Sequence, residues 1–489
     1  MSKHAYSPAN MGRGGERRRR SSVPSQALIR GEAMFCYGDA LSYVNSLINY
    51  ERKDPSSYDR LSFNLERMNH LLSVLGRPHQ DLKAIHIAGT KGKGSTAAIT
   101  ASILTAADLK VGLYTSPHLL TPRERIRIGS SLITPEEFAY FLSRIKSRVE
   151  AAPYLEPTFF EVYTALAFVY FSHHKVDLAV LETGLGGRLD ATNVARALVG
   201  IITQISFDHM DKLGHNLASI AREKAGIIKE GIDVVSSPQE DAVSSVIEEA
   251  CREKKAHLFR VGKEISFELL DASPDGQRFL VETTARSYPD LFLSLLGQHQ
   301  VINAATAIGA VDLLESYGIL IPRKAIVEGL RKVEWTARIQ VISKDPLLIV
   351  DCAHNGASAL ALSKCLRELF PGKRIILVLA ILQNKDVKEI GRALFPLSER
   401  VILTKADSPR SMEPEEIKTL LGDLCSGKTV ITRNAREAVK YSLRLTSPET
   451  LICFAGSSYL AGEVLALMNK SAKSGAKEEE RGGKTCLRV

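Results

Sequence analysis

The chain has 489 residues, of which 45% are hydrophobic and 24% are charged. This composition is typical of a globular protein with two or three cores, and it excludes a disordered chain, a collagen-like repeat and a disulfide-stapled miniprotein. Apolar runs such as Leu178-Ala-Val-Leu181 have the length of a strand, whereas a bilayer-spanning helix needs about 20 residues. Seven cysteines are scattered without C-x-x-C spacing, which predicts a reducing, cytoplasmic setting with neither a zinc site nor disulfides.

The formal net charge of +9 is concentrated at the two ends of the chain. Residues 1–32 carry seven basic and two acidic side chains, and residues 470–489 carry six and three. The ends therefore hold +8 of the +9, and the body is nearly neutral. Because a nucleic-acid-binding protein would spread basic side chains over a folded face, we expect no nucleic-acid partner, and we expect no membrane partner.

Both ends are predicted to be disordered tails, over residues 1–33 and 470–489, because they lack an apolar period. Three interpretations of the Arg-rich first tail are open. It is a solvated tail or an upstream start, with Met34 as a second start site; it is a transit peptide for an organelle; or it is a nucleic-acid-binding arm.

From about residue 34, short β-branched runs alternate with amphipathic segments. This alternation predicts a mostly parallel sheet covered by helices on both faces. The predicted strands are 82–87, 110–114, 176–181, 199–203 and 233–236, and the predicted helices include 95–107 and 134–149. Residues 267–295 alternate apolar and polar side chains around a turn, which predicts a small antiparallel sheet.

A second alternating series has predicted strands at 347–350, 375–379, 401–403, 430–431 and 451–454. We therefore predict an α/β protein of two domains. An N-terminal P-loop-type domain, a mostly parallel sheet with helices on both faces, covers residues 34–338. A smaller C-terminal Rossmann-like domain covers residues 339–469, and the boundary lies near residues 335–344.

One glycine-rich segment follows a predicted strand and opens a predicted helix. It reads Gly89, Thr90, Lys91, Gly92, Lys93, Gly94 and Ser95. Unobstructed backbone N–H groups and the positive end of a helix form a cradle for phosphate, and Lys93 can reach a terminal phosphate. The spacing departs from G-x-x-x-x-G-K-[ST], because Gly94 follows Lys93. An ordinary tight turn is the alternative.

This segment resembles the ATP-binding loop of the Mur ligase superfamily, specifically its folate branch, the dihydrofolate synthase/folylpolyglutamate synthase family. Further segments match in order over residues 38–465. They are 114–119, 123–127, 158–161, 182–193, 207–210, 223–229, 297–300 with Asn303, and 351–355. One departure is visible at the linker between the domains, where the family often has Trp-Pro-Gly-Arg and this chain has Trp335-Thr-Ala-Arg338.

The resemblance implies an ATP-dependent carboxylate–amine ligase. It would add L-glutamate to dihydropteroate, to a folyl(poly)glutamate, or to both. A carboxylate is a poor electrophile, so ATP would first convert it to an acyl phosphate, with Mg²⁺ and cations neutralising the transferred charge. The implied cofactors are ATP and Mg²⁺ at two positions, and the partners are the small-molecule substrates. We expect a monomer.

The resemblance assigns Ser116, Glu182 and His209 to magnesium and makes Lys93, Lys224 and His209 catalytic. Glu182 ends a predicted buried strand, where open α/β folds bind ligands, and its oxygens suit Mg²⁺; a solvated strand-end acid is the alternative. By itself His209 would be a plain loop or core histidine, since imidazole favours softer metals. Lys224, by itself a surface lysine, would be a carbamylated lysine, which requires the neutral amine that burial favours.

The remaining site residues are also implied by the resemblance. ATP contacts would come from Asn303, Arg338, Asp351 and His354, although His354 could simply begin a helix. The pteroate pocket would be lined by Thr158, Phe159, Phe160, Glu161, Leu189, Asp190 and Ala191, although the two phenylalanines could belong to the core. The incoming glutamate would bind at Lys385 and Arg410, which could equally be solvated surface charges.

Three other function classes each fit part of the sequence. A Mur-type ligase that acts on a UDP-muramoyl substrate would share the loop, Glu182 and Lys224, but it gives no reason for the segment 158–161 or for the short first domain. A nucleic-acid-stimulated ATPase would depend on the basic tail, so deletion of residues 1–33 separates it from a ligase. A nucleotide-binding module without turnover would not need Lys93, Glu182 and Lys224 together.

Overall fold

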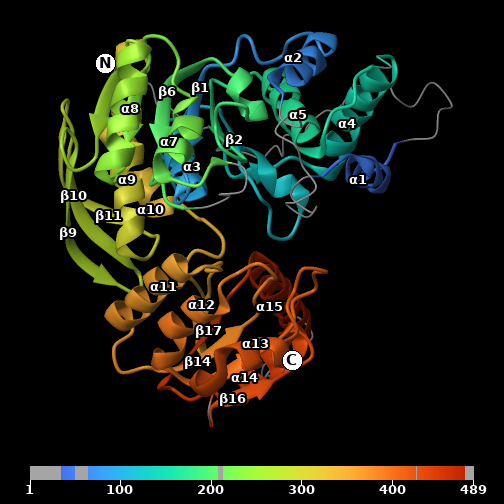
Figure 1. Cartoon of the computed structure of the whole chain (residues 1–489), viewed down its shortest axis with the longest axis vertical. Helices are drawn as coiled ribbons and strands as arrows, with labels where there is room; N and C mark the ends of the chain where they lie inside the picture. The colour runs from blue at the N-terminus through green and yellow to red at the C-terminus, as the bar shows by residue number, and fades with distance from the viewer. Residues whose placement is uncertain (1–34, 50–63, 153, 208–212, 426, 480–489) are drawn as a thin grey trace, which may run out of the picture.

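The computed structural model describes residues 35–49, 64–152, 154–207, 213–425 and 427–479 (Figure 1). The predicted tail 1–33, residues 480–489 and His209 lie outside these residues. The described chain forms two sheets flanked by helices and one small sheet. We call the part built around the eight-stranded sheet the first unit and the part built around the six-stranded sheet the second unit.

The first sheet has the strand order β4-β3-β2-β5-β1-β6-β7-β8. Its strands are β1 (Ala84–Ala88), β2 (Val111–Tyr114), β3 (Ile126–Ile128), β4 (Ser131–Leu132), β5 (Leu178–Glu182), β6 (Ala197–Ile202), β7 (Asp233–Ser236) and β8 (His257–Arg260). Neighbouring strands pair in parallel except β2 with β3 and β3 with β4, which are antiparallel. The predicted mostly parallel sheet is confirmed, and the five predicted strands begin and end within two residues of their observed bounds. Strands β3, β4 and β8 were not predicted.

Helices cover both faces of this sheet. Ile85 and Ile87 face α3 (Lys93–Ala106), α9 (Gln298–Leu313) and α10 (Arg323–Lys332). Ala84 and Ala88 point to the opposite face. That face is covered by α2 (Leu65–Val74), α4 (Pro135–Glu150), α5 (Phe159–His173), α7 (Leu217–Ala225) and α8 (Asp241–Glu253), and α1 (Tyr37–Ser46) packs on α4. Because both faces are buried, the strands are apolar at nearly every position.

The small sheet contains β9 (Ser266–Ser273), β10 (Gly276–Glu282) and β11 (Ser287–Leu293), all antiparallel. This confirms the antiparallel sheet predicted for 267–295. Strand β11 leads directly into α9, so the position of this sheet sets where α9 begins.

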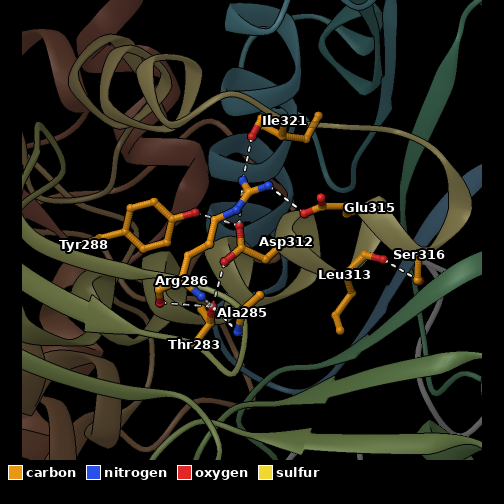
Figure 2. A network of polar contacts seen from close by, with 9 residues as sticks. All are labelled: Thr283, Ala285, Arg286, Tyr288, Asp312, Leu313, Glu315, Ser316 and Ile321. Atoms are coloured by element: carbon orange, nitrogen blue, oxygen red, sulfur yellow. Dashed lines mark hydrogen bonds and ion pairs between the residues drawn. The ribbon is translucent and has the colours of Figure 1, made fainter.

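A buried polar network fixes the small sheet to the end of α9 (Figure 2). Asp312 on α9 accepts hydrogen bonds from Tyr288 Oη at 2.7 Å and from Thr283 Oγ1 at 2.8 Å. Arg286, in the turn before β11, donates to Glu315 at 2.6 Å. Asp312 and Tyr288 are buried, and hydrogen bonds in a low-dielectric interior are stronger than in water. The network therefore holds α9 in a fixed position against the small sheet.

The second sheet has the order β12-β13-β17-β14-β15-β16. Its strands are β12 (Gln340–Lys344), β13 (Leu347–Val350), β14 (Arg374–Leu379), β15 (Ser398–Leu403), β16 (Thr429–Ile431) and β17 (Thr450–Ala455). One face is covered by α11 (Gly356–Leu369), α12 (Val387–Leu394) and α13 (Pro414–Leu421), and the other by α14 (Ala435–Leu443) and α15 (Ser458–Glu479). Only β12 is antiparallel to its neighbour among these strands. A second, smaller α/β unit is thereby confirmed.

The two units are joined by the segment between α10 and β12. The predicted domain division at 338/339 falls in this segment and stays a prediction, as does the boundary at 469, where α15 continues to Glu479. Among the residues that the structure covers, no helix is long and apolar enough to span a membrane.

Candidate active site

The glycine-rich loop connects β1 to α3 and needs its glycines for close approach. Gly92 immediately precedes α3 with φ +87, and a Cβ there would lie 2.4 Å from Asn303 Oδ1. A Cβ on Gly89, with φ +152, would lie 1.9 Å from Thr203 Oγ1. Side chains would therefore push the loop away from β6 and α9. The predicted ATP residues of this loop and Asn303 are brought together.

Backbone and lysine contacts hold the loop in place. The N–H groups of Thr90 and Lys91 both donate to the carbonyl of Gln204, at 3.0 Å. From the other side, Lys224 Nζ on α7 donates to the carbonyl of Gly89 at 2.7 Å. Lys224 is only 4% exposed, so the surface-lysine interpretation is wrong. The first turn of α3 therefore presents its N–H groups from a fixed loop, as an anion-binding helix end requires.

Glu182, the last residue of β5, is the centre of the site. It is 4% exposed, so the solvated-acid interpretation is wrong. Burial raises the pKa of Glu182, while the charge of Lys93, a hydrogen bond from the Ser116 N–H at 3.1 Å, and the charges of Arg338 and Arg125 act in the opposite direction. A buried carboxylate is costly unless cations and hydrogen bonds surround it, and here they come from four separate segments of the chain.

The glycine-rich loop lies against this carboxylate. A Cβ on Gly94 would lie 3.4 Å from Glu182 Oε2 and 2.9 Å from the ring of Trp335. The departure from the common phosphate-loop pattern therefore has a physical reason, because serine or threonine at position 94 would collide with the Trp335 side chain. Ser95, the next residue, is buried at the start of α3.

Arg125 is a site residue that sequence reasoning missed. It is 1% exposed, and its guanidinium carbon lies 5.4 Å from the ring centroids of both Phe159 and Tyr163. Its Nε donates to His118 Nδ1 at 2.9 Å. Two aromatic faces stabilise a desolvated cation, which explains how an arginine is tolerated next to Glu182 inside the first unit. The segment 123–127 was matched, but arginine is ordinarily an exposed residue, so nothing in the sequence indicated this burial.

Arg338 occupies a strained turn of the linker. Its neighbours Ala337 and Ile339 adopt φ +55 and +47, which is uncommon for alanine and rare for a β-branched residue. Asp351 stabilises the turn, because its Oδ2 accepts from the Ile339 N–H at 2.7 Å and its Oδ1 accepts from the Ala353 N–H at 2.7 Å. The chain thus makes a sharp turn here without the proline and glycine common in the family. The turn brings the Arg338 charge near Glu182.

The structure gives Asp351 and His354 structural contacts. Burial raises the pKa of Asp351. Both oxygens of its carboxylate accept hydrogen bonds from backbone N–H groups, those of Ile339 and Ala353. His354 Nδ1 lies 2.8 Å from the Cys352 carbonyl oxygen, and its N–H donates to Ser358 Oγ. Contacts of either residue with ATP stay a prediction.

The segment predicted to line the pteroate pocket begins α5. Thr158 and Glu161 form a capping box, in which Glu161 Oε2 accepts from the Thr158 N–H at 2.7 Å and pairs with Arg67 Nε at 2.8 Å. Phe159 is 3% exposed and belongs to the core, so its core interpretation is correct. Phe160 is half-buried and lies against Gly184, where a Cβ would come within 2.5 Å of its ring.

The other predicted pteroate segment is a loop organised by Asp190. Its Oδ2 accepts from the N–H groups of Gly184 and Leu185, at 2.8 and 2.9 Å, and its Oδ1 accepts from Thr192. Ala191 is buried and Leu189 is half-buried. Asp190 therefore shapes the loop that follows Glu182, and the loop brings Gly184 beside Phe160.

The predicted glutamate residues are brought to one edge of the second sheet. Lys385 follows β14 and Arg410 follows β15. The Gln383 N–H donates to the Arg410 carbonyl at 2.8 Å, and an isolated bridge joins Leu382 to Ser411. Both side chains are half-buried. Two loops that are distant in sequence therefore form one surface at the carboxyl ends of the strands, where α/β folds bind ligands.

The oxygen donors around Glu182 suit magnesium rather than a softer metal. In the described part of the chain, no group of three or more His, Cys, Asp or Glu residues could hold a metal. Magnesium fits such a site, because it keeps several waters and uses one or two carboxylates together with substrate phosphates. Ser116 and Glu182 are adjacent, whereas the third predicted ligand, His209, lies outside the described residues.

The raised pKa of Glu182 has a consequence for stability. The folded state favours the protonated carboxyl, so this stabilisation is present at low pH and is lost as pH rises through the folded pKa. In EDTA without nucleotide, Glu182→Gln should therefore melt above wild type at pH 7.5, by about 1–2 °C for an effect of about 1 kcal/mol, and the difference should shrink near pH 4. Differential scanning fluorimetry measures it. Exposed Asp81→Asn is the control, and a variant that melts below wild type at pH 7.5 would contradict the burial argument.

Two family models match the chain. Residues 87–311 match the Mur ligase middle domain, and residues 337–458 match the glutamate ligase domain of Mur ligases. The dihydrofolate synthase/folylpolyglutamate synthase of Bacillus subtilis (strain 168) is 33% identical over 437 residues, which are 88% of this chain and 98% of that protein.

Solved structures agree with these matches. Mycobacterium tuberculosis folylpolyglutamate synthase complexed with ADP superposes with a TM-score of 0.79 at 32% identity, covering 88% of this chain and 98% of that chain. Escherichia coli FolC in complex with DHPP and ADP superposes with a TM-score of 0.78 at 29% identity, covering 89% of this chain and 98% of that chain.

Proposed function

Because the chain belongs to the dihydrofolate synthase/folylpolyglutamate synthase family of Mur ligases, we propose that it is an ATP-dependent ligase that joins L-glutamate to dihydropteroate, to a folyl(poly)glutamate, or to both. The observation that carries the proposal is the buried Glu182 carboxylate beside a phosphate loop and within reach of three cationic side chains. Such a cluster can neutralise the negative charge of a transferred phosphoryl group.

The first step makes an unreactive acid reactive. A carboxylate oxygen of the acceptor attacks the γ-phosphorus of ATP, the bond from that phosphorus to ADP breaks, and an acyl phosphate forms. Lys93 and the first N–H groups of α3 hold the phosphates, and Arg338 adds a planar cation from the linker. Asn303, Asp351 and His354 complete the proposed nucleotide contacts.

Magnesium would be held by Ser116, Glu182 and His209, and when bound it supplies charge neutralisation to the phosphates. The residues of the chain do the rest. Lys93, Arg125 and Arg338 supply fixed positive charge whose effect on Glu182 is already present without ligand. Preorganised charge of this kind needs no rearrangement during the reaction.

The second step forms the amide. The amine of glutamate attacks the acyl carbon, the carbon–nitrogen bond forms, the amine loses a proton, and inorganic phosphate leaves with the former carboxylate oxygen. Lys385 and Arg410 would bind the glutamate carboxylates, while the loops around Phe160 and Asp190 would bind the pteroyl group. Closing the units together would exclude water, which would otherwise hydrolyse the acyl phosphate. We propose that the partners are these small-molecule substrates and that the protein is a monomer. The scattered cysteines support a reducing, cytoplasmic setting.

An ADP-release assay tests this function. With ATP and glutamate, dihydropteroate or tetrahydrofolate should each be compared with a UDP-muramoyl acceptor. We expect glutamate-dependent release with one or both pteroyl acceptors, no release with the UDP-muramoyl acceptor, and full activity after deletion of residues 1–33. Lys93→Ala should lower the rate at least about 100-fold, because it removes preorganised charge, whereas exposed Lys83→Ala should not. Release that requires the UDP-muramoyl acceptor, or nucleic acid and the tail, would contradict the proposal.

Lys224 is proposed to be carbamylated. The neutral amine adds CO₂ and becomes an anionic carbamate, which can help organise metal and phosphate near the loop. Two observations support this proposal. The Lys224 side chain is buried, and its Nζ donates a hydrogen bond to the backbone of the loop at Gly89.

Carbon-13 NMR of protein equilibrated with ¹³C-bicarbonate tests this modification. Wild type should show a carbamate resonance that is absent in Lys224→Ala. The variant should lose at least about 100-fold in turnover and recover part of it with a short carboxylic acid, which replaces the missing anion. Wild-type turnover in Lys224→Ala, or the same spectrum in both proteins, would contradict the modification.

A further inference from the structure

The loop that follows β2 contacts both units. Its second residue, Ser116, donates a backbone hydrogen bond to Glu182 in the first unit. Three residues later, Leu119 packs against a core cluster of the second unit whose members include Leu460 and Val464. Helix α15, which carries these residues, lies on the side of the second unit that faces the first (Figure 1). The same short loop therefore borders the reaction site and the second unit.

The contact between this loop and α15 depends on a glycine inside the helix. A Cβ on Gly462 would lie 2.7 Å from the Leu119 carbonyl oxygen and 3.6 Å from Leu120 Cδ2. Gly462 does not have a positive φ, so its backbone does not require glycine. Glycine inside a helix is destabilising relative to alanine. At this position, glycine allows the loop of the first unit to approach the helix closely, and this contact offsets the loss of helix stability.

The loop is too rigid to absorb a displacement. The Glu124 carboxylate accepts hydrogen bonds from three consecutive N–H groups, those of Leu119, Leu120 and Thr121, at 2.8, 2.9 and 2.7 Å. His118, the residue before Leu119, accepts from Arg125 Nε. A shift of Leu119 would therefore disturb two contacts of the loop. They are the hydrogen bond from Ser116 to Glu182 and the hydrogen bond from Arg125 to His118.

Helix α15 also contacts the loop that leads to Arg410. Glu463, the residue after Gly462, accepts a hydrogen bond from the Asp407 N–H at 2.7 Å. Asp407 lies three residues before Arg410, which is in the proposed glutamate site. Consecutive residues of one helix thus contact the loop beside Glu182 and the loop that carries Arg410.

We propose that Leu119 and Gly462 are positioning residues whose contact sets the second unit against the Ser116 loop, so that the acyl phosphate formed near Glu182 meets the glutamate amine rather than water. This inference rests on the proposed function. It concerns only the coupling between the two steps, because neither residue touches the reacting atoms.

The test compares phosphate released with amide formed. In wild type the two should be equal, with little phosphate released when glutamate is omitted. Gly462→Ala and Leu119→Ala should each raise the phosphate-to-amide ratio at least about threefold and raise the KM for glutamate about tenfold, since a displacement of about 1 Å can change rates by up to 100-fold. The KM for ATP should change much less.

Two controls separate this effect from general damage. Gly38→Ala, in helix α1, meets nothing closer than 3.5 Å, and Leu360→Ala removes a leucine that is 64% exposed on α11; both should keep the wild-type ratio. If one test variant fails to fold, the other gives the result. A wild-type ratio in the folded variants, or equal loss of both products, would overturn the inference. Failure of the proposed function is distinguishable, because wild type itself would then form no glutamyl amide.

Discussion

A single buried charge constrains most of the site. Glu182 ends a central strand and is almost inaccessible to water. An isolated carboxylate in such a position would be neutral or would destabilise the fold. The chain surrounds it with Lys93 from the phosphate loop, Arg125 from the segment before β3, and Arg338 from the linker. The positions of these three segments are therefore coupled, because displacing any one of them removes a positive charge that stabilises the buried carboxylate.

The same constraint explains the unusual features around the carboxylate. Gly94 is required because Trp335 and Glu182 leave no room for a side chain. The left-handed Ala337 and Ile339, each costing about 1–3 kcal/mol, are retained because the turn that they form carries Arg338 between the units. Backbone strain of this kind persists only where other contacts overdetermine it, and here the Asp351 carboxylate supplies such a contact.

Much of the fold was predictable because its signals are local. Alternating apolar strands and amphipathic helices indicated both sheets, and the glycines between β1 and α3 indicated a tight loop at the start of a helix. Strands β3 and β4 were missed because three- and two-residue strands carry no periodic pattern. The backbone roles of Asp351 and Asp190 were also missed, because a carboxylate that binds its own neighbourhood has the same sequence pattern as one that awaits a ligand.

The remaining site features depend on contacts between distant segments. Arg125 is buried only because Phe159 and Tyr163, more than thirty residues away, stack on it. Nothing within α15 requires a glycine at position 462. The glycine is explained by the close approach of Leu119 from the other unit. Such features cannot be recognised in a single sequence, since nothing near either residue specifies its partner.

We propose that the charge cluster at Glu182 activates the acceptor acid by promoting transfer of a phosphoryl group from ATP to a carboxylate oxygen of that acid. Isotope transfer tests it directly. Dihydropteroate or a folate labelled with ¹⁸O in the reacting carboxylate should be converted in the presence of ATP and glutamate, and the released phosphate analysed by mass spectrometry. If an acyl phosphate forms, each released phosphate molecule should contain one ¹⁸O atom. Unlabelled phosphate accompanied by amide formation would contradict it.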